Sequence, residues 1–253
     1  MNPHFKREKL KEKELIVAVV DFKIGPVSDV DLGKQIKALI IADQGVGKTV
    51  LAASLAVARP KGLHIDIDKG SKSLVSPYAK KIGINSTNLD TVQVRTLDDV
   101  GKIWERVVEK KEYSTVIVDS ISMLQENYTS DLLGASRETM EMRDWGKLRN
   151  AMFRLMTRVG NTPDINIVCT VHTKKKDQLV SGAEKWSPML SGQFGDLVGA
   201  FFDYVFFIES RLEGVRRVYY QPTDKFYAKD RSGKLGKYDD DPTFASIVAK
   251  LTA

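Results

Sequence analysis

The chain has 253 residues, a formal net charge of +6 and apolar side chains at 42% of its positions. The apolar fraction excludes a disordered chain, and the longest apolar runs fall far short of the roughly 18 residues that a membrane-spanning helix needs. A single cysteine, Cys169, excludes an internal disulfide framework and a cysteine-based zinc site. Because the charged N-terminus lacks the apolar segment of a signal peptide, the sequence predicts a cytoplasmic protein with no membrane partner.

Residues 1–34 are predicted to form an N-terminal extension, a charged arm followed by the strand Leu15–Ile24. Residues 35–253 are predicted to form one domain, since no Gly/Ser-rich or Pro-rich linker divides them. Within this domain, apolar β-branched runs alternate with helical patterns. The expected elements are, in chain order, strand Gln35–Ile41, helix Lys48–Arg59, strand Gly62–Ile67, helix Lys72–Ile82, strand Thr91–Arg95, helix Leu97–Lys111, strand Thr115–Val118, helix Asp144–Val159, strand Ile165–Val171, strands Asp203–Ile208 and Val215–Gln221, and helix Thr243–Leu251.

Two helices carry further local signals. Thr96 is a candidate N-cap for the helix that begins at Leu97, and the segment Tyr128–Glu141 is expected to be irregular. In the helix Asp144–Val159, Trp145 is the first of several apolar residues spaced by three and four, which predicts one buried face. Trp104 is likewise expected to be a core residue.

The order of these elements predicts the fold class. Strands that are apolar on both faces and alternate with helices are typical of a parallel sheet covered on both sides. The last two strands follow each other without a helix and suggest an antiparallel addition. The sequence therefore predicts an α/β fold, with a mostly parallel sheet, helices on both faces and a C-terminal antiparallel extension.

The sharpest motif is the run A-D-Q-G-V-G-K-T, between the strand that ends at Ile41 and the helix that begins at Lys48. Two glycines allow successive backbone N–H groups to turn inward around a phosphate, and the following helix adds its positive N-terminal end. Lys48 can reach the β- and γ-phosphates, and the Thr49 hydroxyl can bind Mg²⁺. The expected nucleotide-binding residues are Asp43, Gln44, Gly45, Val46, Gly47, Lys48, Thr49 and Val50. The usual first glycine is replaced by Ala42.

An acidic residue at the end of a second strand completes this prediction. Asp119 follows the uncharged run Thr115–Val118, so it is expected at the carboxyl edge of the sheet, where open α/β sheets bind ligands. There it can orient Mg²⁺ together with Thr49. The sequence therefore predicts ATP and Mg²⁺ as cofactors.

Six motifs together resemble the RecA-like P-loop ATPases over residues 35–250: A-D-Q-G-V-G-K-T, H-I-D-I-D-K-G, V-I-V-D-S, D-W-G-K-L-R, I-V-C-T-V-H and A-K-D-R-S-G. Within that group, the chain resembles phage nucleotide-binding proteins, some of which are core-only recombinases of single-strand annealing systems. The resemblance implies a RecA-like ATPase that acts on single-stranded DNA and assembles as a filament or ring in a bacterial host cytoplasm. A phage recombination protein or a single-strand-binding protein is a possible further partner.

The resemblance also assigns two catalytic roles near the nucleotide. Asp68 falls where the family usually has a glutamate that activates the attacking water, and the aspartate is one methylene shorter. His172 falls at the end of a strand where the family has a polar residue that senses the γ-phosphate. The alternatives are a solvated carboxylate for Asp68 and a structural role for His172.

Two further segments have roles that the resemblance implies. Residues 173–195 correspond to a DNA-binding loop of the family, in which lysines contact phosphates and an aromatic residue stacks on a base. The candidate DNA-binding residues are Lys174, Lys175, Lys176, Lys185 and Trp186. In the motif A-K-D-R-S-G, Lys229 and Arg231 are expected to reach the nucleotide of a neighbouring subunit. A solvated basic loop with a buried tryptophan and a charged surface hairpin are the alternatives.

Two other functions fit parts of the same pattern. An ATP-binding mediator or loader with little hydrolysis of its own is favoured by the short Asp68 side chain. A small-molecule P-loop kinase uses the same phosphate loop, but the sequence lacks the Arg-rich lid that such a kinase needs. The leading hypothesis is a Mg²⁺-dependent ATPase in phage recombination or replication.

Overall fold

A computed structural model describes residues 34–177 and 184–253. The predicted strand Leu15–Ile24 and all but the last residue of the predicted extension lie outside the described residues, so they stay predictions.

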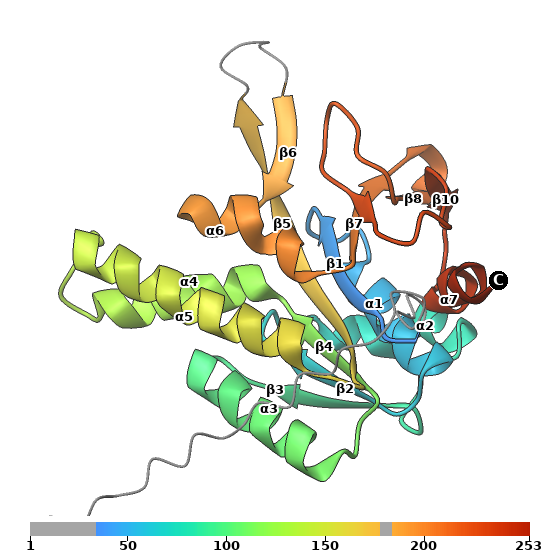
Figure 1. The fold of residues 1–253 in the computed structure, drawn as a ribbon, viewed down its shortest axis with the longest axis horizontal. Helices are drawn as coiled ribbons and strands as arrows, with labels where there is room; N and C mark the ends of the chain where they lie inside the picture. The colour runs from blue at the N-terminus through green and yellow to red at the C-terminus, as the bar shows by residue number, and fades with distance from the viewer. Residues whose placement is uncertain (1–33, 178–183) are drawn as a thin grey trace, which may run out of the picture. The chain divides into compact units, whose positions relative to one another are not determined.

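A twisted parallel sheet forms the centre of the described chain (Figure 1). Its six parallel strands lie in the spatial order β7, β1, β5, β4, β2 and β3. Their bounds are β1 Lys37–Ala42, β2 Gly62–Asp66, β3 Leu89–Gln93, β4 Thr115–Asp119, β5 Asn166–Asp177 and β7 Tyr204–Ser210. Strand β5 therefore lies between the strand that precedes the glycine-rich loop and the strand that ends in Asp119. This arrangement confirms the predicted α/β class.

Antiparallel strands extend the sheet at two places. β8 (Arg216–Tyr219) pairs with β7, and β10 (Tyr238–Asp240) pairs with β8. The short β9 (Lys229–Asp230) pairs with the start of β7, and β6 (Glu184–Pro188) pairs with the far half of β5. The predicted C-terminal antiparallel extension is confirmed.

Helices cover both faces of the sheet, with short 3₁₀ turns between some of the elements. The helices are α1 Lys48–Ala58, α2 Pro77–Lys81, α3 Leu97–Lys110, α4 Ile121–Leu133, α5 Met142–Asn161, α6 Gly192–Leu197 and α7 Phe244–Thr252. The 3₁₀ turns are η2 Gly70–Val75, η3 Val198–Phe201 and η4 Leu212–Gly214. No helix in the described ranges is long and apolar enough to span a membrane.

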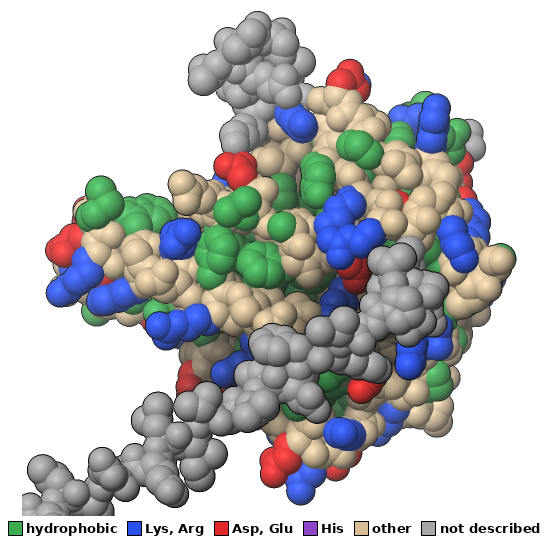
Figure 2. All heavy atoms as spheres, viewed as in Figure 1, with side chains coloured by type: hydrophobic (Ala, Val, Ile, Leu, Met, Phe, Trp, Pro, Cys, Tyr) green, Lys and Arg blue, Asp and Glu red, His purple; other side chains and the backbone are tan. Residues whose placement is uncertain are grey.

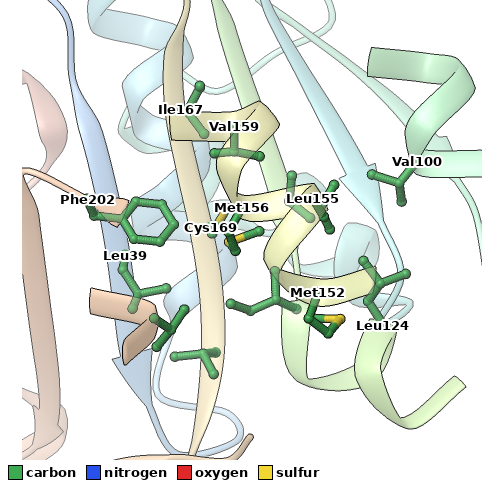
Figure 3. Packing of buried hydrophobic residues seen from close by; sticks show 14 of the residues in the cluster. Leu39, Val100, Leu124, Met152, Leu155, Met156, Val159, Ile167, Cys169 and Phe202 are labelled. Atoms are coloured by element: carbon green, nitrogen blue, oxygen red, sulfur yellow. The ribbon is translucent and has the colours of Figure 1, made fainter. Parts of the chain in front are cut away.

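The alternation of side chains along β1 divides the core into two clusters. Leu39 and Ile41 pack with buried residues of α3, α4 and α5, while Ile40 and Ala42 pack with α1 and α7 on the other face. Figure 3 shows the first cluster, in which Met152 and Met156 of α5 pack close to Leu124 and Cys169. Cys169 is fully buried, and burial raises the pKa of its thiol, so it is an inert core side chain.

Local signals explain where several elements begin. Thr96 accepts a hydrogen bond from the Asp99 backbone, and the Asp99 side chain accepts one in return, which confirms the predicted cap of α3. The expected helix Lys72–Ile82 is divided in two, because Ser76 has an extended backbone and caps a new helix with Pro77 in its first turn.

One expectation about the helices holds only in part, since residues 134–141 are irregular but 128–133 are not, and another is wrong. The segment Tyr128–Glu141 is helical as far as Leu133, where α4 continues before its C-cap at Gly134. Trp145 is 43% exposed, whereas Trp104 is 1% exposed and donates a hydrogen bond to Thr162. Trp145 lies beside the apolar face of α5 rather than within it, because that face is already filled by Leu148, Met152 and Met156.

Candidate nucleotide-binding and catalytic site

The carboxyl ends of the parallel strands bring four of the predicted catalytic residues, Lys48, Asp68, Asp119 and His172, to one edge of the sheet. Ala42, at the end of β1, is in register with His172 on β5. Asp66, at the end of β2, is in register with Asp119 on β4. We call this group, which consists of the loop Asp43–Thr49 with Asp68, Asp119 and His172, the nucleotide edge.

The loop Asp43–Thr49 has the backbone that a phosphate cradle needs. Gly45 and Gly47 have φ angles of +79° and +97°, a region that side chains with a Cβ disfavour. Lys48 begins α1 directly after the second of these turns, and Val50 is buried beneath it. Ala42 lies in an extended strand, so its methyl group is accommodated without a glycine. Asp43, Gln44 and Gly45 are exposed, and Val46 packs against the α1 side of the core.

Lys48 lies at the centre of the nucleotide edge and is 5% exposed. Its Nζ donates to the carbonyl oxygens of Ala42 and Asp43, at 3.1 and 2.7 Å, and lies 3.2 Å from Nδ1 of His172. Burial lowers the pKa of the Lys48 amine, and the nearby carboxylates of Asp119, Asp68 and Asp43 oppose that shift. The Lys48 amine is therefore enclosed by oxygen acceptors and has little contact with solvent.

Asp119 is fully buried and is surrounded by hydrogen-bond donors. Thr49 Oγ1 donates to Asp119 Oδ2 at 2.6 Å, His64 Nε2 lies 3.2 Å from the same oxygen, and Thr170 donates to Oδ1. Burial by itself would raise the pKa of this carboxyl, but His64 and the two hydroxyls together hold it below the ordinary value. Asp119 is thus kept ionised next to Thr49.

The two oxygen ligands predicted for Mg²⁺ therefore lie side by side, and the space beside them is open. A Cβ atom at Gly70 would lie 3.1 Å from Thr49 Oγ1 and 3.4 Å from Asp119 Oδ2, so glycine keeps this space free. Within the described ranges, no group of three His, Cys, Asp or Glu side chains is arranged to hold a metal by itself. Mg²⁺ commonly takes one or two protein ligands together with waters and substrate phosphates, so these residues fit Mg²⁺ that arrives with a nucleotide.

Asp68 and His172 form a pair on the open side of Lys48. Asp68 Oδ2 lies 2.9 Å from His172 Nε2, and the other ring nitrogen of His172 faces Lys48. The backbone N–H of His172 donates to Ser122 at the start of α4. His172 thus connects the phosphate-binding lysine with the carboxylate predicted to position water, and it continues directly into the projecting part of β5.

Sequence reasoning missed several polar residues of this site. His64 and Thr170 are fully buried and hold Asp119, and Asp66 accepts hydrogen bonds from the backbone of Gly70 and Ser71, at 2.9 and 3.2 Å. Each occupies a strand position where alternation gives no reason to expect function. A polar residue inside an apolar strand is the only sequence signal that marks them.

Arg216 also lies against the phosphate loop. A Cβ atom at Gly47 would be 2.8 Å from Nη1 of this arginine, whose guanidinium stacks over the Tyr78 ring at 4.5 Å. Asp241 holds the Arg216 Nε at 3.0 Å. Strand β8 of the C-terminal extension thus places a positive charge beside the loop, and α2 contributes the aromatic ring that stacks on it. In the sheet, β8 lies on the opposite side of β1 from β5, which carries His172.

Within the predicted DNA-binding segment 173–195, residues 173–177 and 184–188 pair as two antiparallel strands, which we call the ribbon, and α6 follows; residues 178–183 lie outside the described part. Strand β5 continues past the sheet edge and pairs with β6, and the ribbon projects from the domain (Figure 1). Lys175 is paired with Trp186 across the ribbon, with its Nζ 5.4 Å from the centre of the indole ring. The backbone of Lys176 pairs with Lys185, and the side chain of Lys176 lies outside the described part.

The degree of burial differs along the ribbon. Lys174 and Lys175 are exposed, while Lys185 and Trp186 are half-buried. The Trp186 backbone donates to the Lys225 carbonyl oxygen at 2.7 Å, and its side chain packs against the core. Trp186 therefore has one face against the domain and a lysine over its ring.

Lys229 and Arg231 lie at the other end of β7 from the nucleotide edge. β9 pairs with Tyr204 and Val205, near the start of that strand, so neither side chain can reach the loop Asp43–Thr49 of its own chain. Lys229 donates to the carbonyl oxygens of Gly199 and Phe202, and burial lowers the pKa of its amine. Arg231 pairs with Asp203 at 2.5 Å, and its side chain is 52% exposed.

Comparison with known proteins agrees with this geometry. The chain matches a protein family described as an AAA domain, and the match spans residues 34–232, which is most of the sequence. The matched region begins just before β1 and ends just after Arg231. No curated protein matches the sequence.

Proposed function

This chain belongs to the AAA domain family, whose members are generally nucleotide-binding ATPases, and from that premise we propose that it is a Mg²⁺-dependent ATPase acting on single-stranded DNA. The observation that carries this proposal is the convergence of Lys48, Asp119 and His172 at one sheet edge. The phage recombination subgroup is the most specific form of the proposal, and it is supported by the sequence motifs alone.

Nucleotide binding is assigned to the loop Asp43–Thr49. The inward N–H groups around Gly45 and Gly47 cradle the phosphates, and Lys48 moves from the loop carbonyls to the β/γ-phosphate oxygens. Thr49 and Asp119 hold Mg²⁺, which supplies charge neutralisation at the phosphates when it is bound. Arg216 and Tyr78 border the loop on the opposite side from His172, where the sugar and base would lie.

Hydrolysis is assigned to Asp68 and His172. Asp68 is 27% exposed at its side chain, so water can reach it, and it can accept a proton from the attacking water or hold that water in line. His172 contacts both Asp68 and Lys48, so a γ-phosphate bound at Lys48 would change its partners. That change would pass into β5 and the ribbon, because His172 is part of the same continuous strand.

Completion of the site is assigned to a neighbouring subunit. Arg231 is exposed and far from its own phosphate loop, and its one ion pair within the described part of the chain is with Asp203. In a head-to-tail oligomer, it would reach the nucleotide of the next chain and stabilise charge on the transferred phosphoryl group. Lys229, held by two backbone carbonyls, would fix the position of this segment.

Binding of single-stranded DNA is assigned to the ribbon. Lys174 and Lys175 are exposed there, and the half-buried Trp186 offers a ring face once Lys175 moves to a phosphate. Trp145 adds an exposed indole near the foot of the ribbon, beside a groove of about 240 Å³ that Ser191 and Phe194 also line.

A second candidate is an ATP-binding mediator with little hydrolysis. The contact between Asp68 and His172 favours it, because a short carboxylate already engaged by an imidazole has less reach toward a water. Steady-state ATP turnover with and without single-stranded DNA separates the two. Turnover that rises with DNA and is lost in Lys48→Ala supports the ATPase, whereas tight ATP binding with negligible turnover under every DNA condition supports the mediator.

A further inference from the structure

Helix α5 carries an unusual concentration of positive charge on its exposed surface. Its sequence contains five basic residues and a single acid, Asp144, which is fully buried. Arg137, which precedes the helix, forms an ion pair with Asp144 at 2.5 Å. Asp144 therefore neutralises little of the positive charge of the helix itself. The buried face of α5 packs on the core through Leu148, Met152 and Met156, and Phe153 packs beside it against Phe194 and Phe201.

Four of the five bases lie in one row. At 100° per residue, Arg143, Lys147, Arg154 and Arg158 fall within about 60° of one another around the helix, and the row spans about 22 Å along its axis. All four are exposed. Figure 2 shows Lys and Arg side chains along the edge of α5 that lies toward α3. We call these four residues the α5 row.

The α5 row has few acidic partners. Lys147 Nζ is 3.5 Å from Asp144, and Arg158 is 3.3 Å from Glu105 on α3. Exposed ion pairs such as Arg158–Glu105 contribute little stability, and the arginine can readily exchange its carboxylate for another anion. Among the described residues, neither Arg143 nor Arg154 has a carboxylate within ion-pair distance. These two guanidinium groups are therefore positioned on a rigid helix and available to an anion.

A shallow groove accompanies the row. It has a volume of about 160 Å³ and lies between α3 and α5, where Leu97, Ala151 and Leu155 give it an apolar floor below Arg154 and Arg158. A linear array of cations beside an apolar groove matches the chemistry of a single nucleic-acid strand, whose phosphates form a line on one side of apolar sugars and bases. A duplex presents two charged strands and would leave the narrow groove unused.

We propose that the α5 row is a binding track for the phosphate backbone of single-stranded DNA, separate from the ribbon of β5 and β6. This proposal depends on the proposed function in one respect: it takes DNA as the polyanion that the row binds. It requires neither ATP nor a second subunit, since all four bases come from one helix. The track contacts the backbone alone, so it holds the strand without selecting its sequence.

Fluorescence anisotropy of a labelled single strand of about 30 nucleotides tests the proposal, with the full chain and without ATP. The double variant Arg143→Gln/Arg154→Gln removes the two unpaired bases of the row. The matched control, Arg106→Gln/Lys110→Gln, removes the same charge from exposed positions on α3. We expect the row variant to bind about tenfold more weakly at low salt, and its plot of log affinity against log salt to be shallower by roughly 1.4, at about 0.7 per phosphate contact.

Three outcomes would overturn the proposal that the α5 row binds single-stranded DNA. Equal losses in the row and control variants would show a general effect of net charge. Unchanged binding in the row variant would leave the ribbon as the DNA site, and a loss confined to a duplex of the same sequence would contradict the single-strand assignment. Because ATP turnover is measured separately, row-dependent binding by a chain without turnover would preserve this inference while refuting the proposed ATPase.

Discussion

The nucleotide edge and the segment that carries Arg231 differ in how a single chain holds them. At the nucleotide edge, Lys48 is 5% exposed and Asp119 is fully buried, and each has several partners from different strands. Arg231 is 52% exposed at its side chain and has one surface ion pair. The first region is organised by the fold itself. Among the described residues, the side chain of Arg231 is held by little besides that pair, in keeping with the role proposed for it at a neighbouring subunit.

Replacement of Arg231 is expected to have the largest effect. Arg231→Ala should lower ATP turnover by about 10³-fold while leaving ATP affinity nearly unchanged, because an arginine supplied in trans acts mainly in the transition state. Arg211→Ala is the matched control, since Arg211 is similarly exposed and also has one surface ion pair. Full turnover by Arg231→Ala would assign this residue to a surface hairpin and remove the argument for a shared site.

Lys48→Ala removes the central charge of the nucleotide edge. We expect turnover to fall by at least about 100-fold and ATP affinity to fall with it, because the lysine interacts with the phosphates in both the ground and transition states. Lys110→Ala, on the exposed face of α3, provides the control. If Lys48→Ala retained wild-type affinity for ATP, the nucleotide would have to bind elsewhere.

Substitution of His64 tests whether a buried side chain that contacts Asp119 matters as much as the residues predicted to contact the nucleotide. His64→Leu should weaken Mg²⁺-dependent ATP binding by about 10- to 100-fold, because the side chain that orients a metal-binding carboxylate is lost. Thr91→Val removes only the hydroxyl on the far side of His64, at 3.1 Å, and should cost much less. Equal effects of the two substitutions on a Mg²⁺ titration would contradict the proposed support.

The same substitution should change acid stability. The pKa of Asp119 is held below its ordinary value of 3.8, so its contribution to the free energy of unfolding is complete above that value and is lost as the pH falls below it. In His64→Leu, the pKa of Asp119 should rise, so the stability that this carboxyl contributes above pH 3.8 should be smaller, and less of the free energy of unfolding should be lost on acidification. Denaturant unfolding between about pH 3 and 6 measures this shift, and identical profiles would show that His64 does not control Asp119.

The smallest expected effect concerns the ribbon. Trp186→Ala should reduce affinity for single-stranded DNA by roughly 5-fold, the lower end of the range of about 1–3 kcal/mol that base stacking on an aromatic ring contributes, because part of the ring already packs against the core. Its side chain also packs against the core, so the thermal stability of the variant must be compared with that of Trp104→Phe, a fully buried indole remote from the ribbon. DNA affinity that falls only in proportion to lost stability would leave Trp186 a structural residue.

Much of the fold follows from local sequence patterns. The loop Asp43–Thr49, the end of β4 at Asp119 and the cap at Thr96 could be predicted because each depends on short spacings of residues with a specific backbone requirement. The same holds for the parallel sheet, whose strands are apolar on both faces.

What could not be predicted depends on contacts between distant segments. The buried His64 side chain contacts Asp119 only because β2 and β4 are neighbours. Likewise, Arg216 reaches Gly47 only because β8 folds back beside β7. Trp145 fits a helical apolar pattern, but Leu148 and Met152 already fill the interface, so the indole remains at the surface. The length of β5 beyond His172 is set by its pairing with β6 rather than by its lysine-rich sequence.

The central claim is that one chain binds the nucleotide and the next chain completes the reaction. Mixing equal amounts of Lys48→Ala and Arg231→Ala tests it most directly, because each variant is inactive alone for a different reason. At interfaces where an intact phosphate loop meets an intact Arg231, turnover should return, to about a quarter of the wild-type rate for random head-to-tail assembly. A mixture as inactive as its two components would contradict the shared site.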